Sequence, residues 1–433
     1  MRLISRAGLW SHADFRRFWA GDTVSQFGSQ ISLLAIPLLA AITLDATPLQ
    51  MGILSAAGTL PALLVGLFVG VWVDRFRRRP IMIAADLGRA AIIFVIPLTS
   101  LLGWLNMHVL IAVSLIAGSL TIFFDISYLS YLPSLVRRDR LVEANSKLQS
   151  TASLAQVAGP GLAGGLVALI TAPFALLVDA GSFLVSAWFL HRIKTAEPPP
   201  SQVDQTPILR QIRQGMAVVT SHPLLRPLAA CDAVYSLGGN IFMAVYVLYL
   251  TRDLGLSAGV IGLIFALGGI GALVGSTLAG PLAHRIGQGP AMIWGQLLFG
   301  LTGLLIPMAV LIPRYALPLV AASEFSQWLA LLLYVVNAVS VRQTVSPDRL
   351  LGRVNATMRF LRSGVLPVGS LLGGVLGGII GVPWTLVVGE FGMLIAVALL
   401  LRSPLRQLRA AEFPVEEPEP PAPPVVIIDT TVG

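Results

Sequence analysis

Charged residues are scarce in this chain. Of its 433 residues only 12% are Asp, Glu, Lys or Arg, whereas 55% are apolar, and the mean hydropathy is +0.82. An average soluble domain carries about 25% charged residues. A soluble core does not need so many uncharged stretches, so the composition excludes an ordinary soluble protein and indicates one that crosses a membrane several times.

Cysteine is nearly absent, and so are the sequence motifs of enzymes. Cys231 is the only cysteine and lies in an apolar segment, so a single chain can form neither a disulfide framework nor a thiolate metal site. The sequence contains no Walker loop, no HExxH and no GxSxG, which leaves ATP-driven transport and hydrolysis unsupported. We therefore expect no catalytic residues, no metal and no cofactor, and any transport has to draw on a gradient.

Twelve apolar stretches are present instead. They are 18–44, 49–73, 81–103, 107–134, 145–169, 171–191, 226–250, 257–282, 291–312, 315–341, 355–380 and 382–402. Each is long enough for a helix to cross a bilayer of about 30 Å. The sequence predicts an all-α membrane protein with twelve transmembrane helices in two six-helix bundles, 18–191 and 226–402.

Three polar segments flank these bundles. Residues 1–17 are basic and amphipathic and lack the features of a secretory signal, so we expect them on the membrane surface. Residues 192–225 form a linker with a PPP run and a short amphipathic helix, ILRQIRQGMAVV,. Residues 403–433 are rich in Pro and Glu, and we expect them to be a disordered tail.

Positive charge is distributed unevenly between the two sides of the membrane. Most of the 29 Lys and Arg residues fall in the termini, the linker and the loops on their side, whereas the opposite loops hold only Arg252 and Arg314. Because such residues are retained on the cytoplasmic side, we predict an inner-membrane protein with both termini in the cytoplasm. The net charge of +8 then faces anionic lipid headgroups, and nucleic acid is not required as a partner.

The two halves repeat each other at an offset of 210 positions. The matched pairs are Asp22 and Asp232, Gly28 and Gly238, Gly52 and Gly262, Gly58 and Gly268, and Gly70 and Gly280. Because six is an even number, both copies enter the membrane from the same side. We therefore expect the halves to be related by an axis along the membrane normal, with a pathway between them.

This organisation, with a charged loop after the second span, resembles the major facilitator superfamily over residues 14–402. In the loop, GVWVDRFRRR matches the family pattern G-x-L-A-D-[RK]-x-G-R-[RK] at Gly70, Asp74, Arg75, Arg78 and Arg79. The resemblance implies a latch that closes the cytoplasmic ends of helices 2 and 11. We expect Asp74 near the N-terminus of helix 11 and a bridge from Arg78 to Asp139.

The fifth span contains AQVAGPGLAGGL, which resembles the antiporter motif of the same superfamily. Its residues are Gly159, Pro160, Gly164 and Gly165. Proline removes a backbone hydrogen bond and glycine allows close helix contact, although ordinary small-residue packing is an alternative interpretation. The runs FRRFWAGDTVSQFG, DISYLSYLPSLV and DRLVEANSKLQS further resemble the branch of macrolide, siderophore and multidrug exporters.

Acidic residues inside spans are costly and therefore point to function. Asp86 and Arg89 stand three residues apart and are expected to form a structural ion pair. Asp125 and Glu324 are each unique to one half and fall at mid-depth on helices 4 and 10, which line the cavity in the superfamily. Since burial favours a neutral carboxyl group, these two residues are our candidates for proton coupling.

The remaining candidates line the expected cavity. They are Asp22, Gln26, Gln30, Phe124, Tyr128, Asp232, Asn240, Gln327 and Trp328. Such a lining suits amphiphilic or cationic organic solutes better than sugars or phosphates. The sequence predicts a monomeric, proton-coupled exporter of hydrophobic or amphiphilic small molecules. A nutrient importer on the same fold, or a sensor or scaffold that does not transport, are the alternatives.

Overall fold

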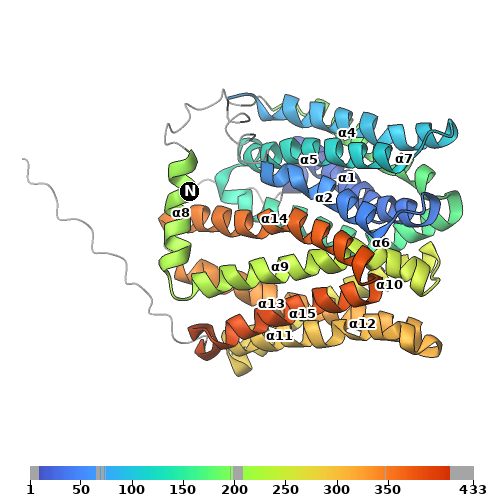
Figure 1. The fold of residues 1–433 in the computed structure, drawn as a ribbon. Coiled ribbons are helices and arrows are strands. Elements are labelled where there is room, and N and C mark those ends of the chain that lie inside the picture. The colour runs from blue at the N-terminus through green and yellow to red at the C-terminus, as the bar shows by residue number, and fades with distance from the viewer. Residues whose placement is uncertain are drawn as a thin grey trace, which may run out of the picture.

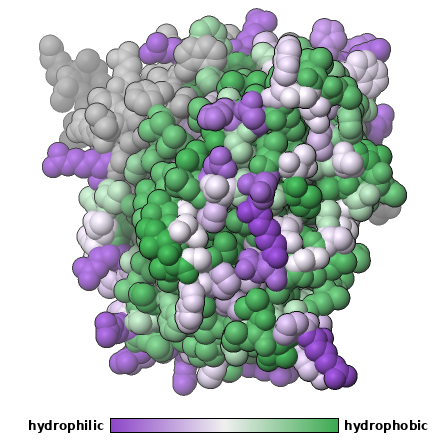
Figure 2. All heavy atoms as spheres, turned by 45° about the vertical axis from the view of Figure 1, so that its right-hand side comes forward, coloured by the Kyte–Doolittle hydropathy of each residue, from purple (hydrophilic) through white to green (hydrophobic). Residues whose placement is uncertain are grey.

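The structure is a computed structural model that describes residues 9–64, 69, 73, 75–195, 197, 208–346 and 348–409. Within these residues the regular elements are all helical (Figure 1). Eleven of the described helices are long and apolar enough to cross a membrane, and α2 is a shorter apolar helix. Apolar side chains cover most of the face shown in Figure 2, with hydrophilic residues in separate groups, as expected for a surface that contacts lipid.

Each predicted span holds one of these helices or helix pairs. The N-terminal bundle contains α1 (Ala13–Leu38), α2 (Pro48–Leu64), α4 (Arg78–Leu101), α5 (Met107–Leu135), α6 (Leu141–Ile170) and α7 (Ala172–His191). The C-terminal bundle contains α9 (Leu225–Leu248), α10 (Ala258–Ile286), α11 (Gln288–Gly303) with its continuation α12 (Leu305–Met308), α13 (Ala316–Val345), α14 (Asp348–Ile379) and α15 (Val382–Leu401). The predicted fold is confirmed.

The molecule has two different ends. Helix α1 begins and α15 ends at the same end, on the left in Figure 1, together with the short helix α8 (Ile208–Ser221). We call this the basic end, because the arginines at 75–79 and 137–140 lie there. At the opposite end, here called the far end, α1 turns into α2 and α9 turns into α10.

The repeat is visible in the backbone itself. The last turn of the first span, Leu39–Thr43, and its equivalent Tyr249–Asp253 are both π-helical. After these turns Asp45 and Gly255 both have positive φ (48° and 62°), and so do Thr171 and Gly381 (70° and 82°) before α7 and α15. Glycine adopts this backbone region without strain, so the C-terminal half has the sequence better suited to a turn that both halves make.

The linker is attached to both bundles. Asp14 of α1 accepts hydrogen bonds from the backbone N–H groups of Lys194 (3.1 Å) and Thr195 (2.8 Å). The predicted amphipathic helix forms as α8 and packs on α14, where Arg353 donates a hydrogen bond to Gln214 (2.7 Å). Next to it, burial lowers the pKa of His222, so its neutral ring accepts the Leu224 N–H (3.2 Å) at the start of α9.

The prediction of a disordered tail was wrong for residues 403–409. Pro404–Gln407 form a short 3-10 helix whose Leu405 is buried, and the Leu408 carbonyl accepts the Gly289 N–H at 3.1 Å. Leu405 and Leu408 are both buried in the core of the C-terminal half. The Pro- and Glu-rich composition of the whole tail did not predict this apolar contact. Residues 410–433 and 1–8 lie outside the described part of the chain.

Candidate functional site

The two bundles meet closely at the far end through two pairs of glycines. On one side Gly52 of α2 faces Gly374 of α14, and a Cβ built on Gly52 would lie 2.7 Å from the Gly374 Cα. On the other side Gly164 of α6 faces Gly262 of α10 with the same 2.7 Å spacing. Real Cβ atoms do not approach this closely, so only glycine fits. Both crossings obey the repeat offset of 210, which gives the interface a twofold character.

Polar contacts reinforce this closure. The hydroxyls of Ser55 on α2 and Ser370 on α14 form a hydrogen bond of 3.0 Å between the bundles. Arg252, after α9, forms an ion pair with Asp45 (2.6 Å) and donates to the Ala41 carbonyl (3.3 Å). The far end is therefore closed.

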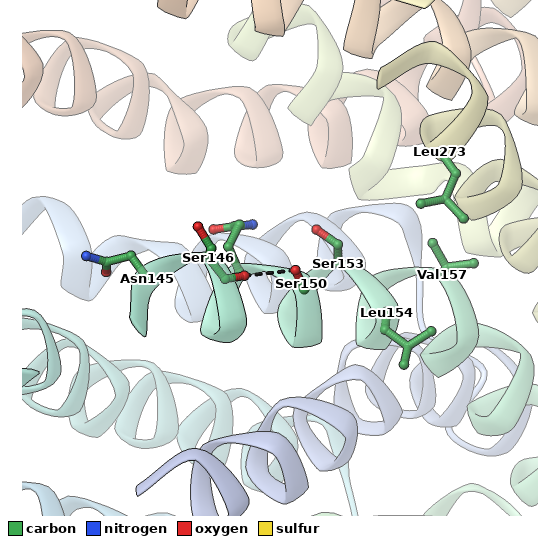
Figure 3. A pocket seen from close by; sticks show the side chains of 8 residues that line it. Asn145, Ser146, Ser150, Ser153, Leu154, Val157 and Leu273 are labelled. Carbon is green, nitrogen blue, oxygen red and sulfur yellow. Dashed lines mark hydrogen bonds between the residues drawn. The ribbon is translucent and has the colours of Figure 1, made fainter. Parts of the chain in front are cut away.

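At the basic end the same helices line a cavity. A cavity of about 890 Å³ opens beside α6 and reaches Leu273 of α10. Figure 3 shows a row of polar side chains along α6, with Val157 facing Leu273 where the two helices approach. The row comprises Asn145, Ser146, Gln149, Ser150 and Ser153. Sequence reasoning missed this lining, although the spacing of Asn145, Gln149 and Ser153 by four residues places them on one helix face.

The antiporter-like motif has three different environments. Gly164 is in the far-end crossing, and Gly159 packs on the Gln30 side chain of α1, where a Cβ would lie 2.7 Å from the Gln30 Cγ. The Pro160 carbonyl lies 2.7 Å from a Cβ built on Gly262, whereas Gly165 has open space around it. Part of the motif therefore forms the contact between the bundles, and Gly165 does not.

A polar and aromatic cluster gathers inside the N-terminal bundle. The carboxyl group of Asp22 is buried, accepts a hydrogen bond from Gln26 (3.5 Å) and lies next to the Tyr128 hydroxyl. Tyr128 stacks on Phe18 (5.1 Å between ring centroids) and on Phe124 (6.1 Å). The structure thus brings Asp22, Gln26, Phe124 and Tyr128 together, and their role as a cavity lining stays a prediction.

The predicted ion pair between Asp86 and Arg89 forms and is buried. The guanidinium of Arg89 also lies over the rings of Phe124 (4.3 Å) and Phe183 (4.2 Å). Its charge is therefore satisfied within the bundle by an acid and two aromatic faces.

In the C-terminal bundle Glu324 has two hydrogen-bond donors. The Tyr246 hydroxyl donates to one carboxylate oxygen (2.8 Å), and the Trp328 indole donates to the other (2.9 Å). Glu324 is 5% exposed, whereas Trp328 is 36% exposed. A Cβ on Gly268 of α10 would lie 2.9 Å from the Trp328 indole nitrogen. The backbone of α10 is therefore in close contact with the Trp328 ring.

Three of the predicted cavity residues have partners within the C-terminal half. Gln327 is buried and donates to Glu390 of α15 (2.9 Å), and Asn240 donates to the Ser236 carbonyl of its own helix (2.9 Å). Asp232 accepts a hydrogen bond from Tyr334 (2.6 Å). The contacts of Gln327 and Asp232 join different helices, and each of the three contacts engages a side chain that was expected to face a solute.

The two proton-coupling candidates do not share a depth. Helices α5 and α13 both run from the far end to the basic end. Asp125 lies nearer the basic end of α5 and Glu324 nearer the far end of α13, so the prediction of a common mid-depth was wrong. Asp125 has no hydrogen bond among the described residues and interacts electrostatically with Arg89 and Arg359.

The charged loop makes contacts other than those predicted. Arg78 pairs with Glu197 (3.7 Å), and Asp139 pairs with Arg137 (3.2 Å). The backbone N–H groups of Arg78 and Arg79 donate to Glu197 (2.7 and 3.2 Å). Glu197 caps α4 because an acid is favoured at a helix N-terminus, and the bridge from Arg78 to Asp139 is not formed in this conformation.

The remaining residues of the charged loop differ in their surroundings. The Arg79 side chain donates to the carbonyls of Leu190 (2.8 Å) and His191 (2.5 Å) at the end of α7. Arg75 is exposed. Gly70 and Asp74 lie outside the described residues. The described contacts of this loop thus tie the start of α4 to the end of α7 and to the linker.

Comparisons with known proteins agree with this architecture. Two parallel six-helix bundles around a central path define a transporter of the major facilitator type. The family model described as transmembrane secretion effector, within that superfamily, matches residues 6–430, and the chain belongs to this family. It is 29% identical over 426 residues to the enterobactin exporter EntS of Citrobacter koseri, covering 96% of this chain and 98% of the relative.

Two solved structures show a similar fold. A bacterial homologue of the iron transporter ferroportin in an inward-facing state gives a TM-score of 0.74 at 17% identity, covering 91% of this chain and 99% of that one. An outward-facing structure, also of a bacterial homologue of ferroportin, gives 0.56 at 18% identity, covering 90% and 98%. Both similarities concern the fold described above.

Proposed function

We propose that this chain is a proton-coupled exporter of hydrophobic or amphiphilic small molecules that works by alternating access. Its place in a family of secretion effectors and its similarity to an enterobactin exporter support export. The arginines at the basic end support a cytoplasmic location for that end and for both termini. The membrane is then the bacterial inner membrane.

The observation that carries the proposal is the difference between the two ends. The bundles touch backbone to backbone at the far end, whereas a polar cavity lies beside α6 and α10 at the basic end. With the basic end in the cytoplasm this is an inward-facing state, ready to take solute from inside the cell. The twofold relation of the crossings lets the bundles rock about the centre as rigid bodies.

Proton movement is assigned to Glu324 and Asp125. Glu324 lies nearer the far end and Asp125 nearer the basic end, so each is reached most directly from one side of the membrane. A proton taken up by Glu324 in the outward-facing state and released through Asp125 in the inward-facing state moves against the direction of the solute. Each proton moved across 100 mV supplies about 2.3 kcal/mol.

Purified protein in liposomes tests this proposal. A pH gradient is imposed, and movement of a lipophilic dye and of protons is recorded together. We expect the wild-type protein to move both in opposite directions, and we expect Asp125→Asn and Glu324→Gln to abolish gradient-driven dye movement. Asp253→Asn serves as the matched control, because Asp253 is exposed at the far end and forms no ion pair with another described residue. Dye movement unaffected by the gradient or by both substitutions contradicts proton coupling.

A further inference from the structure

Helix α14 carries two arginines deep within its membrane span. Arg359 and Arg362 lie roughly 16 and 21 Å from the start of the helix at Asp348, at 1.5 Å per residue. Both side chains are exposed, and neither forms an ion pair or hydrogen bond with another described residue. A cation at this depth is costly in lipid, so it is expected to face a cavity or a partner.

The face of α14 that carries Arg359 is the one that meets the other bundle. Ser370, three turns further along, bonds to Ser55 of α2. Gly377, five turns further along, packs on Pro48 of α2 and on Val245 of α9. Toward the basic end the same face carries Arg359, and its charge acts on Asp125 of the N-terminal bundle. Arg359 therefore points into the space between the bundles.

Arg362 lies on the adjoining face, toward α9. Its charge acts on Asp232 of α9. Gly369, two turns further along α14, packs on the Leu237 carbonyl of α9, which fixes the direction of this face. The two arginines thus border the space between the bundles, on the side of α14 that lies between α2 and α9.

The acids near this space are arranged differently. Asp22 and Glu324 are buried and accept hydrogen bonds within their own bundles. Asp232 accepts one from Tyr334, and Asp86 is neutralised by Arg89. Asp125 alone among these acids has no hydrogen-bond donor in the described part of the chain. The accessible charge beside this space is therefore mainly positive, which disfavours the cationic solutes that the sequence left open beside amphiphilic ones.

We propose that Arg359 and Arg362 form the recognition site for an anionic group, such as a carboxylate, a phenolate or a sulfonate, on the transported amphiphilic molecule. This inference rests on the proposed function and names its substrate class. Guanidinium groups bind oxyanions through paired, charge-assisted hydrogen bonds. Asp125 competes with the solute for Arg359.

Three probes that share one ring system test the charge preference. They are 1-pyrenebutyrate, 1-pyrenebutanol and 1-pyrenebutyl-trimethylammonium, which are anionic, neutral and cationic at pH 7.4. Binding to full-length protein in phosphatidylcholine nanodiscs is measured by equilibrium dialysis against empty nanodiscs. We expect the wild-type protein to bind pyrenebutyrate most tightly.

The variants separate recognition from folding. Arg359→Gln with Arg362→Gln should weaken pyrenebutyrate binding by roughly 10- to 100-fold, the range for losing charged hydrogen bonds, and should leave pyrenebutanol binding nearly unchanged. Arg359→Lys with Arg362→Lys keeps the charge and should retain most of the affinity. Arg226→Gln with Arg402→Gln removes the same charge at the exposed basic end and should have no effect. Size exclusion and thermal unfolding check that each variant is folded.

The outcomes distinguish this inference from the proposed function. Wild-type protein that binds the cationic or neutral probe more tightly, or binds no anion, overturns the inference, and so does unchanged anion binding in the glutamine variant. If the wild-type protein shows no preference for the anion but still moves a probe against a gradient in liposomes, the proposed export stands. If anion binding follows the arginines but no gradient moves any probe, recognition is supported and the proposed function fails.

Discussion

The hydroxyl oxygens of Ser55 and Ser370 lie 3.0 Å apart, although the residues belong to different bundles. This contact lies next to the Gly52–Gly374 crossing, so the two hydroxyls can meet only when α2 and α14 are in contact at the far end. A residue pair that meets in only one state of a transporter offers a means of trapping that state.

We predict that Ser55→Cys with Ser370→Cys forms a disulfide on oxidation, because an S–S bond of about 2.05 Å is within reach of side chains already in contact. The background carries Cys231→Ala, since Cys231 is the only native thiol. Transport should stop on oxidation and return on reduction. Full transport by protein whose cross-link is verified by mass spectrometry would show that α2 and α14 need not separate here.

Neighbouring glycines of α6 should differ sharply in their tolerance of a methyl group. Gly164→Ala places a Cβ 2.7 Å from the Gly262 Cα, whereas a Cβ on Gly165 meets nothing within 4 Å. Since overpacking costs about 1–3 kcal/mol, Gly164→Ala should disfavour the closed far end and lower the cross-linking rate of the cysteine pair about tenfold or more. Gly165→Ala should behave as wild type. Equal rates in the two variants contradict the assignment.

Glu324→Gln should uncouple the protein without unfolding it. The glutamine carbonyl can accept from the Trp328 indole, and its NH2 group can donate to the Tyr246 hydroxyl, so both hydrogen bonds can be kept. We expect gradient-driven transport to disappear while exchange of labelled for unlabelled solute, which needs no net proton movement, continues. Tyr246→Phe removes one donor but keeps the carboxyl group, and it should remain coupled. Loss of exchange in Glu324→Gln would indicate a role in solute binding or folding instead.

Asp125→Asn should tighten the binding of anions. It removes the acid whose charge acts on Arg359, and coupling of this kind typically changes affinity by roughly 5-fold or more. Equilibrium dialysis with pyrenebutyrate measures the change, and the same substitution combined with Arg359→Gln should abolish the gain. Weaker anion binding in Asp125→Asn would mean that Asp125 holds Arg359 in place for the solute.

Glu197→Ala should destabilise the N-terminal bundle. It removes the acceptor for two N–H groups at the start of α4, a type of loss that costs about 1 kcal/mol. Asp139→Ala removes an exposed pair with Arg137 and should change the free energy of unfolding by less than about 0.5 kcal/mol. Thermal unfolding in detergent compares them. A transport defect in Asp139→Ala without instability would support the bridge to Arg78 in the opposite state.

Much of the fold could be predicted because hydropathy sets the spans and the repeat relates them. The glycines at 52 and 262 were visible as repeat mates, but their partners were not, because sequence does not tell which helices cross. The different depths of Asp125 and Glu324 could have been read from the span boundaries. The Glu197 cap could not, since a linker acid can reach many helix ends, and only the fold selects one.

The role of Arg359 could not be predicted from the sequence either. A cation within a span signals function, but whether it faces lipid, a neighbour or a pathway depends on which face of α14 meets the second bundle. Ser370 and Gly377 settle that question only once their contacts with α2 are known.

The attachment points of the linker have a mechanical consequence. Lys194, Thr195 and Glu197 are tied to α1 and α4, whereas Gln214 is tied to α14. Tilting one bundle against the other must change the distance between these anchors, and residues 198–207 can extend to no more than about 35 Å. The length of this short tether therefore sets an upper bound on how far the two bundles can separate at the basic end.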